Sequence, residues 1–236
     1  MGRLNVKDDL LILIPAYNEA AFITGVVAAV RPLAARVLVV DDGSGDRTAE
    51  LAAAAGAEVV RHPVNRGKGR ALQTGFRYAL DKGYRVVLVM DGDGQHHPED
   101  IPGLLERFQR GGVGVVVGCR PRNLANMPLD RFLTNWFTSA LVSLLAGQCI
   151  RDSQCGFRVF DSRVFPALSF STGRFDTESE VLVEASRAGF RIASAPVRTI
   201  YGQEKSKINP LVDTLRFFRF CLRMLGRICL GRACPR

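Results

Sequence analysis

Two aspartates separated by a single glycine follow an apolar stretch near the middle of the chain. Residues 86–90 are all apolar, and they run directly into Asp91-Gly92-Asp93-Gly94. An apolar run bounded by polar residues indicates a buried strand, and residues i and i+2 of an extended chain point to the same side. Asp91 and Asp93 would then present two carboxylates together, which suits a divalent cation that keeps waters and binds substrate phosphates. The glycines let a large ligand approach the backbone.

A turn that uses Asp and Gly for their local conformations is the alternative interpretation of this motif. Two other apolar stretches, however, also end in polar residues. Residues 10–14 are followed by Tyr17, Asn18 and Glu19, and residues 37–40 by Asp41 and Asp42. Ligands of open parallel sheets bind beyond the carboxyl ends of the strands. We therefore expect the three polar strand ends to meet at one edge of a sheet.

The segments between these motifs predict an α/β fold, in which a doubly wound and mostly parallel sheet positions the polar strand ends. Helices are expected over residues 20–34, 46–55 and 70–82, with a short strand over residues 58–61. Strands that alternate with helices through short loops favour this Rossmann-like arrangement. The glycine-rich turn of dinucleotide-binding proteins is missing after the first strand, so a dehydrogenase is excluded.

A short basic and glycine-rich segment, residues 65–69, precedes the third expected helix. Its spacing differs from that of the Walker phosphate-binding loop. Two interpretations stay open, namely a loop near a donor site and a solvated loop at the start of a helix. His62, His96 and His97 lack partners at metal-ligand spacing, so we expect them to be loop or surface residues rather than metal ligands.

The composition limits the class of protein. The chain has 236 residues, of which 47% are hydrophobic, enough for one sizeable α/β domain or two small ones. Its six cysteines form no Cys-x-x-Cys pair, so reduced thiols are expected rather than a disulfide framework or a zinc site. The net charge of +9 is uneven, because residues 201–236 contain eight Lys or Arg and two Asp or Glu. This basic segment suggests an anionic partner, either membrane lipid or nucleic acid.

The motifs together resemble those of family 2 glycosyltransferases. Four of them match in order and spacing: PAYNE (15–19), VVDDGS (39–44), NRGKG (65–69) and DGDGQH (91–96). Four further stretches resemble the polyprenyl-phosphate (dolichol-phosphate) mannosyl- and glucosyltransferase branch: VGCR (117–120), LDR (129–131), DSQCGFR (152–158) and YGQEKSK (201–207). The resemblance implies a single GT-A type domain over residues 9–210, which leaves residues 211–236 as a basic amphipathic tail.

The resemblance also implies roles for individual residues on the donor side. Substrate-binding residues would be Pro15, Tyr17, Glu19, Val40, Asp42, Asp91, Gly92 and Asp93. Val40 and Asp42 would contact the base and ribose of a GDP- or UDP-linked sugar. The ligands of Mg²⁺ or Mn²⁺ would be Asp91, Asp93 and Gln95. Lys207, with Lys205 as the alternative, would reach the donor diphosphate.

On the acceptor side, Arg120 and Arg131 resemble the pair that receives a polyprenyl phosphate. A phosphate monoester is largely a dianion at pH 7, so it needs cations to position it rather than a strong base, and guanidinium groups bind phosphate oxygens in a bidentate manner. Asp93, Arg120 and Arg131 would then be the catalytic residues. The implied reaction is an inverting transfer of mannose or glucose to dolichyl or undecaprenyl phosphate.

Two segments suggest contact with a membrane surface. Residues 132–150 carry no charge over 19 positions, which approaches the ~20 residues that a membrane span needs. A core helix, a helix that dips into the lipid interface and a true span are the three interpretations, of which we favour the second. In residues 210–230, the arginines lie on one helical face beside aromatic and aliphatic residues, as in a helix on an anionic membrane surface. We therefore expect a peripheral protein on the cytoplasmic face of a membrane, with homo-oligomerisation left open.

Two other functions stay open. Family 2 relatives that glycosylate hydroxyl groups use an acid in the region of Asp176 and Glu178 as base, so one of these residues could activate a saccharide acceptor. Acidic residues that favour a helix start are the alternative interpretation of this pair. A non-catalytic nucleotide-sugar or nucleic-acid binding protein is the more remote alternative. We expect no nucleic-acid partner, because the arginines of the tail lie on one helix without a basic patch interleaved with aromatic residues.

Overall fold

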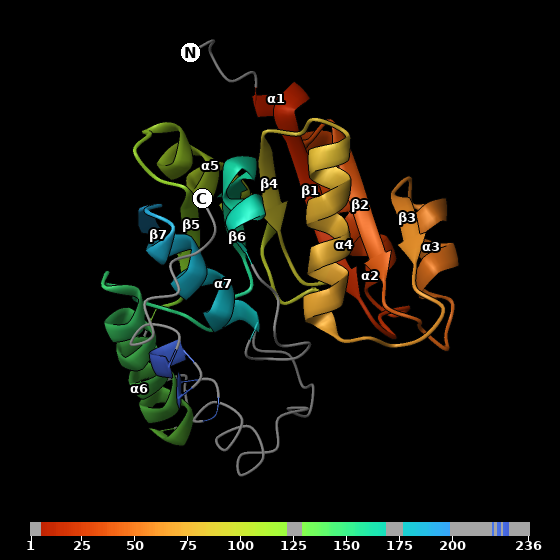
Figure 1. Cartoon of the computed structure of the whole chain (residues 1–236). Helices are drawn as coiled ribbons and strands as arrows, with labels where there is room; N and C mark the ends of the chain where they lie inside the picture. The colour runs from red at the N-terminus through yellow and green to blue at the C-terminus, as the bar shows by residue number, and fades with distance from the viewer. Residues whose placement is uncertain are drawn as a thin grey trace.

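The computed structural model describes residues 6–121, 129–168 and 177–198, together with residues 219, 221, 222 and 224–226. This part of the chain contains a seven-stranded sheet in the order β3-β2-β1-β4-β6-β5-β7 (Figure 1). The strands are β1 (Leu10–Ala16), β2 (Arg36–Asp41), β3 (Glu58–Arg61), β4 (Val86–Val89), β5 (Val115–Cys119), β6 (Arg158–Asp161) and β7 (Ile192–Pro196). Only β6 runs antiparallel to its two neighbours, β4 and β5.

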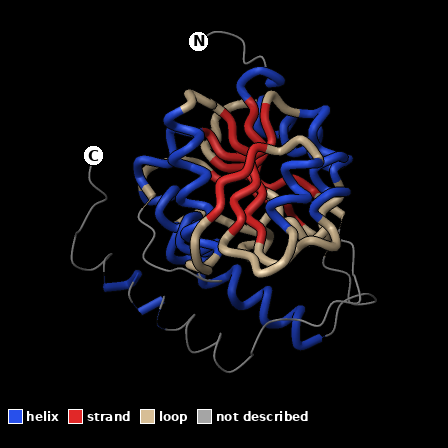
Figure 2. The backbone as a smooth tube through the Cα atoms, turned by 90° about the vertical axis from the view of Figure 1, so that its right-hand side faces the viewer, coloured by secondary structure: helices blue, strands red, loops and turns tan. Residues whose placement is uncertain are grey.

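Helices cover both faces of the sheet (Figure 2). They are α1 (Val6–Asp9), α2 (Ile23–Val30), α3 (Thr48–Ala54), α4 (Lys68–Asp81), α5 (Ile101–Gln109), α6 (Leu129–Ala146) and α7 (Thr177–Arg187), with 3₁₀ turns η1 (Arg31–Leu33), η2 (Pro98–Asp100) and η3 (Ser162–Ala167). α4 packs on β1 and β2 and contacts α7, whereas α2 packs on α3. Leu13 lies against Gly75 of α4, and Ile14 lies with Ile23 of α2 beside Gly92. Successive residues of β1 therefore pack against helices on opposite faces of the sheet.

The central strands are apolar throughout because both of their faces are covered. Every residue of β1 and of β4 is buried, which explains why their sequences are continuous apolar runs rather than alternating ones. The predicted doubly wound, mostly parallel sheet is confirmed. The predicted helices over residues 20–34, 46–55 and 70–82 correspond to α2, α3 and α4 with shifted ends, and the strand over residues 58–61 is β3.

The C-terminal residues that the structure describes are helical and pack on the domain. Cys221 and Met224 are buried in the same apolar core as the strands, whereas Leu222 and Leu225 are exposed. The division between a domain over residues 9–210 and a tail over residues 211–236 stays a prediction, because most of the tail lies outside the described residues.

Candidate active site

The loops that follow β1 and β2 are joined by hydrogen bonds at the lower edge of the sheet in Figure 1. The Asn18 backbone N–H donates to Ser44 Oγ at 2.9 Å, and the Glu19 N–H donates to Thr48 Oγ1 at 2.8 Å. The Gly45 N–H donates in return to Asn18 Oδ1 at 2.9 Å. Asn18 adopts a φ of 57°, a left-handed conformation that Asn tolerates better than most residues. Two of the predicted polar strand ends therefore form one connected unit.

The predicted nucleotide-pocket residues on these strands differ in exposure. Pro15 and Val40 are buried and are paired across β1 and β2, so they form the floor of this edge. The Tyr17 ring is 44% exposed and is accessible to a ligand. A hollow opens beyond β2 and β3, and its lining residues are Gly43, Ser44, Arg61, His62 and Pro63. This edge therefore combines a rigid floor with an open surface.

Asp42 is held by hydrogen bonds from the protein itself. Its side chain is buried, and Oδ1 contacts His62 Nδ1 at 2.7 Å. The carboxylate also accepts the backbone N–H of Arg66 at 3.0 Å and that of Gly67 at 2.6 Å. These bonds fasten the loop before α4 to the end of β2. The contact of Asp42 with a base or ribose stays a prediction, and the described contacts give the residue a role in holding this loop.

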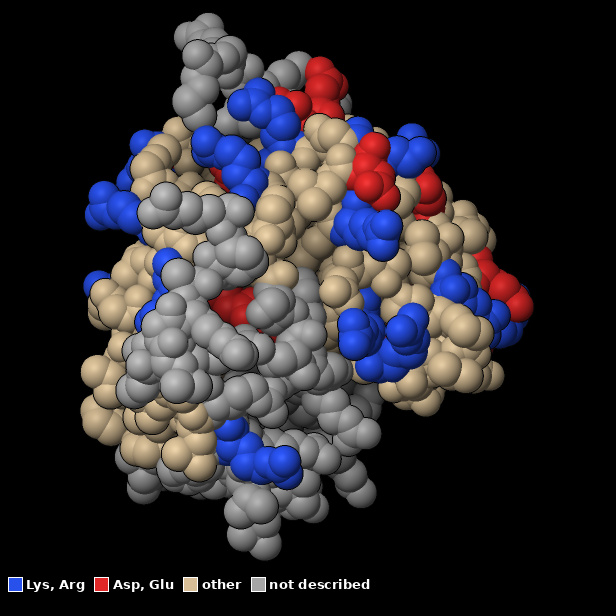
Figure 3. Space-filling model, in the orientation of Figure 1, with Lys and Arg blue, Asp and Glu red and all other residues tan. Residues whose placement is uncertain are grey.

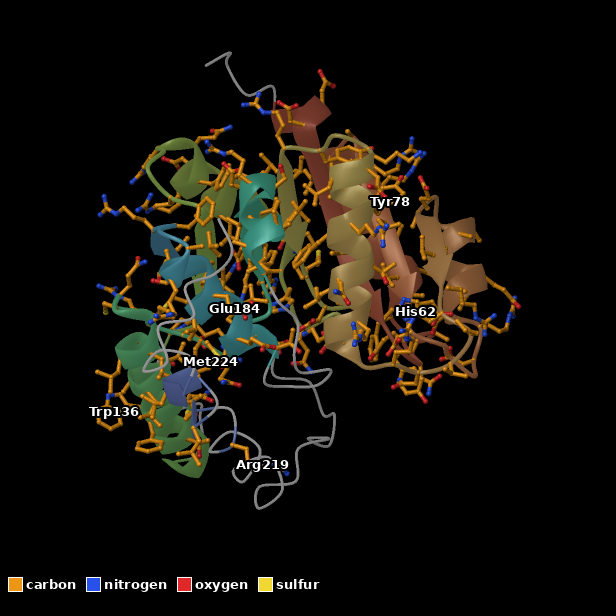
Figure 4. All side chains as sticks on the ribbon, in the orientation of Figure 1. His62, Tyr78, Trp136, Glu184, Arg219 and Met224 are labelled. Atoms are coloured by element: carbon orange, nitrogen blue, oxygen red, sulfur yellow. The ribbon has the colours of Figure 1, made fainter. Side chains whose placement is uncertain are left out.

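The histidines at this edge are more buried than expected. His62 is 6% exposed, and its Nε2 contacts Thr74 Oγ1 at 2.9 Å (Figure 4). The His96 ring stacks on Phe157 with centroids 4.8 Å apart, and its Nε2 lies 3.4 Å from Asp91 Oδ2. Both histidines lie in loops, which is one of the two placements predicted for them, with His62 buried and His96 partly buried. Their partners come from distant parts of the sequence, so local spacing could not indicate them.

Asp91 lies in a cluster of charged side chains that three elements bring together. Lys68 Nζ, at the start of α4, lies 2.5 Å from Asp91 Oδ1. The same ammonium lies 2.7 Å from Oε1 of Glu178, near the start of α7. Lys68 therefore bridges a carboxylate that follows β4 and a carboxylate of α7. The interpretation of residues 65–69 as a solvated helix start does not fit this placement of Lys68.

Asp91 and Asp93 stand in the loop after β4 rather than in the strand itself. β4 ends at Val89, and Gly92 and Asp93 form a turn, so the expected extended geometry through these residues is wrong. Asp93 Oδ1 accepts the Gln95 backbone N–H at 3.0 Å. The motif therefore forms a turn, as the alternative interpretation predicts, and both carboxylates still lie at the edge of the sheet.

The cluster controls the charge of its members. Burial raises the pKa of Asp91, but the Lys68 ammonium and His96 outweigh burial and hold that pKa well below its ordinary range. Burial lowers the pKa of Lys68, but the carboxylates of Asp91 and Glu178 outweigh it and hold the pKa well above its ordinary value. The pKa of Asp93 is raised by burial and by the neighbouring Asp91 carboxylate. Two carboxylates that repel one another are what a shared cation would stabilise.

The donor atoms at this edge fit a hard divalent cation. Mg²⁺ is usually held by one or two carboxylates together with waters and substrate phosphates, and Asp91 and Asp93 supply such a pair. Within the described ranges, no three His, Cys, Asp or Glu side chains converge on one metal position. Ligation by Gln95 stays a prediction.

The loop before β6 closes the charged cluster from the side opposite α4. A Cβ on Gly156 would lie 2.8 Å from Asp91 Oδ2 and 3.2 Å from Lys68 Nζ, so any larger residue here would require this pair to shift. Arg158 is buried and donates to three backbone carbonyls, those of Ser153, Cys155 and Glu178. Arg158 thereby fixes the loop before β6 against the start of α7.

Arg120 follows β5 and is oriented by Asp152. Its Nε and Nη2 donate to the Asp152 carboxylate at 2.7 and 2.9 Å. Burial raises the pKa of Asp152, but its hydrogen bonds with Arg120 outweigh burial and keep the pKa below its ordinary value. The side chain of Arg131, in α6, lies outside the described residues, and so do Asp176, Lys205 and Lys207.

α6 buries two hydroxyl side chains beside aliphatic ones, and it exposes large apolar side chains. Thr138 and Ser139 are buried, whereas Trp136, Phe137 and Leu144 are 53%, 46% and 75% exposed. Val142, Leu145 and Ala146 are buried in the apolar core as well, so α6 is apolar on its inner face and also exposes large apolar side chains, unlike a helix between a core and water. Figure 4 places Trp136 and Met224 at the same lower end of the molecule. In the part of the chain that the structure describes, no helix reaches the length and hydropathy required to cross a membrane.

The mixed, mostly parallel sheet with helices on both of its faces is a GT-A type fold. Residues 11–171 match the family model described as glycosyl transferase family 2. The chain belongs to this family and is an enzyme of the glycosyltransferase class.

Several relatives carry names that specify an acceptor. A Methanococcus voltae UDP-N-acetylglucosamine–dolichyl-phosphate N-acetylglucosaminyltransferase is 29% identical and aligns over 94% of this chain and 99% of its own length. A Micrococcus luteus undecaprenyl-phosphate mannosyltransferase is 29% identical over 80% of this chain and 82% of its own length. A Mycolicibacterium smegmatis polyprenol monophosphomannose synthase is 30% identical over 79% and 76%. The resemblance to polyprenyl-phosphate sugar transferases is therefore confirmed.

A solved structure supports the fold. Glucosyl-3-phosphoglycerate synthase from Mycobacterium tuberculosis, crystallised with Mg²⁺ and uridine diphosphate, superposes with a TM-score of 0.72. The match covers 97% of this chain and 81% of that chain at 24% identity. This likeness shows the GT-A fold.

The sequence indicated the strand ends but did not indicate several contacts around them. The partners Glu178 and Asp152, the buried Arg158 and the Asp42–His62 contact depend on tertiary proximity. Residues 65–69 and the stretch DSQCGFR were the available signals, because they supply Lys68, Asp152, Gly156 and Arg158. Their functions could be assigned only after the fold placed them beside Asp91 and Arg120.

Proposed function

We propose that this protein transfers a hexose, mannose or glucose, from a nucleotide diphosphate sugar to a polyprenyl phosphate at a membrane surface, with inversion at the anomeric carbon. A phosphate oxygen of the acceptor forms a bond to the anomeric carbon. The bond between that carbon and the donor diphosphate oxygen breaks, and the nucleoside diphosphate leaves with the electron pair. An acceptor dianion becomes a monoanionic diester while the leaving group gains one negative charge, so no proton transfer is needed.

The single observation that carries this acceptor assignment is the group of large apolar side chains that α6 exposes, Trp136, Phe137 and Leu144. Ser139 Oγ accepts the Ser153 backbone N–H at 3.1 Å, and Ser143 Oγ accepts the Ile150 N–H at 2.9 Å. The hydroxyl groups of α6 thus support the loop that leads to Asp152, while its aromatic side chains point outward. Such a surface suits the apolar part of a membrane interface, where a polyprenyl phosphate resides.

The donor side supplies electrostatic stabilisation for the leaving group. We assign Asp91 and Asp93 to holding Mg²⁺ or Mn²⁺, with Gln95 as a further ligand, and the bound ion would offset the charge that develops on the diphosphate. Lys207 or Lys205 would reach the same diphosphate. The nucleotide would lie against Pro15, Tyr17, Glu19, Val40, Asp42 and Gly92. A GDP- or UDP-linked donor is compatible with this set.

On the acceptor side, Arg120 and Arg131 would position the phosphate. Asp152 fixes the guanidinium plane of Arg120 through two hydrogen bonds, which reduces the conformational freedom that phosphate binding would cost. Arg131 directly precedes the uncharged segment of α6. This order along the chain places a cation next to the apolar surface that would receive the lipid.

The contacts of Glu178 argue against a hydroxyl acceptor that uses this residue as base. The Glu178 side chain is buried, and its Oε1 is ion-paired with Lys68 at 2.7 Å. A general base must reach the proton that it removes, and this carboxylate instead faces the interior of the charged cluster. The variant of that alternative which uses Asp176 rests on a residue outside the described ranges.

A peripheral position on the cytoplasmic face of a membrane is part of the proposal. The arginines of the tail would add electrostatic attraction to anionic lipid. On the face in Figure 3, the Lys and Arg of the described residues form separate groups rather than one continuous patch. This distribution gives no reason to add a nucleic-acid partner. Homo-oligomerisation stays a prediction.

A direct assay tests the proposal. Purified protein with Mn²⁺ or Mg²⁺ is incubated with radiolabelled GDP-mannose, UDP-glucose or UDP-N-acetylglucosamine and a polyprenyl phosphate, and product is extracted into organic solvent. We expect label in the organic phase with one donor and an inverted anomeric configuration. Label on free saccharide acceptors without label on polyprenyl phosphate would overturn the acceptor assignment.

A further inference from the structure

The ammonium of Lys68 occupies a position between two carboxylates at the donor edge. It lies 2.5 Å from Asp91 Oδ1 and 2.7 Å from Glu178 Oε1. About a quarter of the Lys68 side chain and of the Asp91 side chain is exposed, whereas that of Glu178 is 9% exposed. Lys68 is therefore ion-paired with one partly accessible carboxylate, that of Asp91, and with one enclosed carboxylate, that of Glu178. The accessible one is the residue that we assign to the metal.

The backbone holds Lys68 in this position. Gly67 precedes it with a φ of 90° and donates its N–H to Asp42 Oδ2 at 2.6 Å. On the other side, a Cβ on Gly156 would lie 3.2 Å from Lys68 Nζ. The ammonium is thus placed by α4 and by the loop before β6, and its position is part of the fold rather than one rotamer of a solvated side chain.

We propose that Lys68 is an internal counter-cation that disfavours divalent metal at Asp91 until a nucleotide diphosphate binds. The inference rests on the proposed metal site at Asp91 and Asp93. A divalent ion at Asp91 is repelled by the nearby ammonium, and the repulsion is large because the cluster is partly enclosed. A diphosphate adds negative charge to the site and offsets this repulsion. Metal and donor would then bind with positive coupling, and the empty enzyme would hold metal weakly.

Glu178 has a defined role in this scheme. Its Oε2 is buried and has no hydrogen-bond partner among the described residues, and it borders a cavity of about 10 Å³ that Lys68 and Arg158 also line. When Asp91 coordinates the ion, Glu178 keeps the Lys68 ammonium paired inside the protein. Lys68 and Glu178 are therefore positioning residues that set the order of binding.

The test measures Mn²⁺ binding by electron paramagnetic resonance, with no nucleotide, with UDP and with GDP. We expect wild-type protein to bind Mn²⁺ at least about tenfold more tightly in the presence of the correct nucleotide, a common size for coupling between two ligands. Lys68→Met should tighten Mn²⁺ binding to the nucleotide-free protein by about tenfold and reduce the coupling accordingly. Lys68→Arg, which keeps the cation, should retain the coupling.

The matched control is Lys82→Met, since Lys82 stands at the other end of α4 with its ammonium over the Tyr78 ring. It should leave Mn²⁺ binding unchanged. Lys68→Met leaves Glu178 without its cation, so the double variant Lys68→Met/Glu178→Gln is measured as well and should show the same gain. Glu178→Gln alone should weaken Mn²⁺ binding, because the ammonium then interacts with Asp91 alone.

The outcomes separate this inference from the proposed function. Wild-type coupling that is lost in Asp93→Asn but unchanged in Lys68→Met would overturn the role of Lys68 and leave the metal site intact. Weaker binding of metal-free nucleotide to Lys68→Met, with unchanged Mn²⁺ affinity, would make Lys68 a phosphate ligand and also overturn the inference. Absence of Mn²⁺ binding to wild-type protein under all three conditions would overturn the metal site and, with it, this inference.

Discussion

The helices α4 and α6 both adjoin the candidate active site and both bury aliphatic side chains, but their outward faces differ in polarity. α4 buries Ala71, Leu72, Phe76 and Ala79 and turns charged residues outward. α6 buries Val142 and Leu145 beside Thr138 and Ser139, and it turns aromatic residues outward. α4 lies directly on the sheet, whereas α6 packs on α7 at the periphery. The first pattern suits a boundary between core and water, and the second suits a boundary between the core and an apolar medium.

The two helices also correspond to different tasks, one on the donor side and one on the side of the acceptor and the membrane. The α4 side of the molecule orders charges around the donor, and these charges must act whatever acceptor is used. The α6 side contributes an apolar surface, which matters only when the acceptor or the membrane is apolar. Substitutions on the two sides should therefore differ in which substrate they affect as well as in how much activity they remove.

The largest effect is expected from Asp93→Asn, on the donor side. Loss of one carboxylate from the proposed metal site should lower turnover at least ~10²-fold, the scale for losing one key electrostatic group. The loss should be equal for a long-chain polyprenyl phosphate and for a short soluble analogue, because both use the same donor. Rates with the two acceptors and saturating Mn²⁺ check this prediction. Full activity of the wild-type protein in excess EDTA would contradict it.

The next effect is expected on α6. Phe137→Glu or Leu144→Glu replaces an exposed apolar side chain with a charge and should lower partition onto anionic vesicles about tenfold, since burying one such side chain contributes about 1.5 kcal/mol or more. The rate on a long-chain acceptor should fall while the rate on a short analogue stays near wild type. Vesicle sedimentation and both rates are the measurements.

Leu80→Glu provides the matched control for α6, because Leu80 is an exposed apolar residue of α4 at 43%. This control should sediment with vesicles as the wild-type protein does. Equal losses for the substitutions in α4 and in α6 would mean that the outward face of α6 has no special relation to lipid.

A smaller effect is expected at Gly156, where the loop before β6 meets Asp91 and Lys68. Gly156→Ala places a Cβ 2.8 Å from Asp91 Oδ2, so the carboxylate must shift by a few tenths of an ångström. Turnover should fall roughly tenfold or less, because small displacements of positioned groups affect rate more than stability. Gly103→Ala in α5, where a Cβ meets nothing within 4 Å, should be neutral. Unchanged turnover in Gly156→Ala would show that the Asp91–Lys68 pair tolerates displacement.

The smallest effect concerns the stability and pH dependence of the Asp152–Arg120 pair. Asp152→Asn should destabilise the protein by about 2 kcal/mol at pH 7, the size of a hydrogen bond to a charged group. The folded pKa of Asp152 is lowered, so the stabilisation is complete above the unfolded pKa near 3.9 and is lost as the pH falls through the folded value. Chemical denaturation of both proteins should give a difference that shrinks below about pH 4. A difference that is constant over this range would contradict the ion pair.

The sheet could be predicted because the information was local. β1, β2 and β4 are short apolar runs that end in polar residues, and such runs indicate buried parallel strands wherever they occur in an alternating α/β order. The meeting of their carboxyl ends follows from the topology alone. For this reason the edge that carries Tyr17, Asp42 and Asp91 was predicted before any contact was known.

The remaining features depend on pairs of residues that are distant in the sequence. The four residues of β6 carry an arginine and an aspartate at their ends, and burial of Arg158 becomes favourable only after three carbonyls surround it. The bridge from Lys68 to Glu178 joins α4 to α7, and no local pattern specifies it. The polarity of α6 was visible as an uncharged segment, but which of its faces is buried depends on the position of α7.

The antiparallel strand β6 has a consequence for how the chain folds during synthesis. Residues 10–89 already contain four adjacent parallel strands, so they can assemble as the chain emerges. β5 is made next, yet it cannot join β4 until β6 has been synthesised and inserted between them. Such a non-local pairing slows folding, because loop closure precedes the contacts that reward it. We therefore expect an early intermediate with ordered donor-side strands, in which Gly156 and Arg158 have not yet completed the charged cluster.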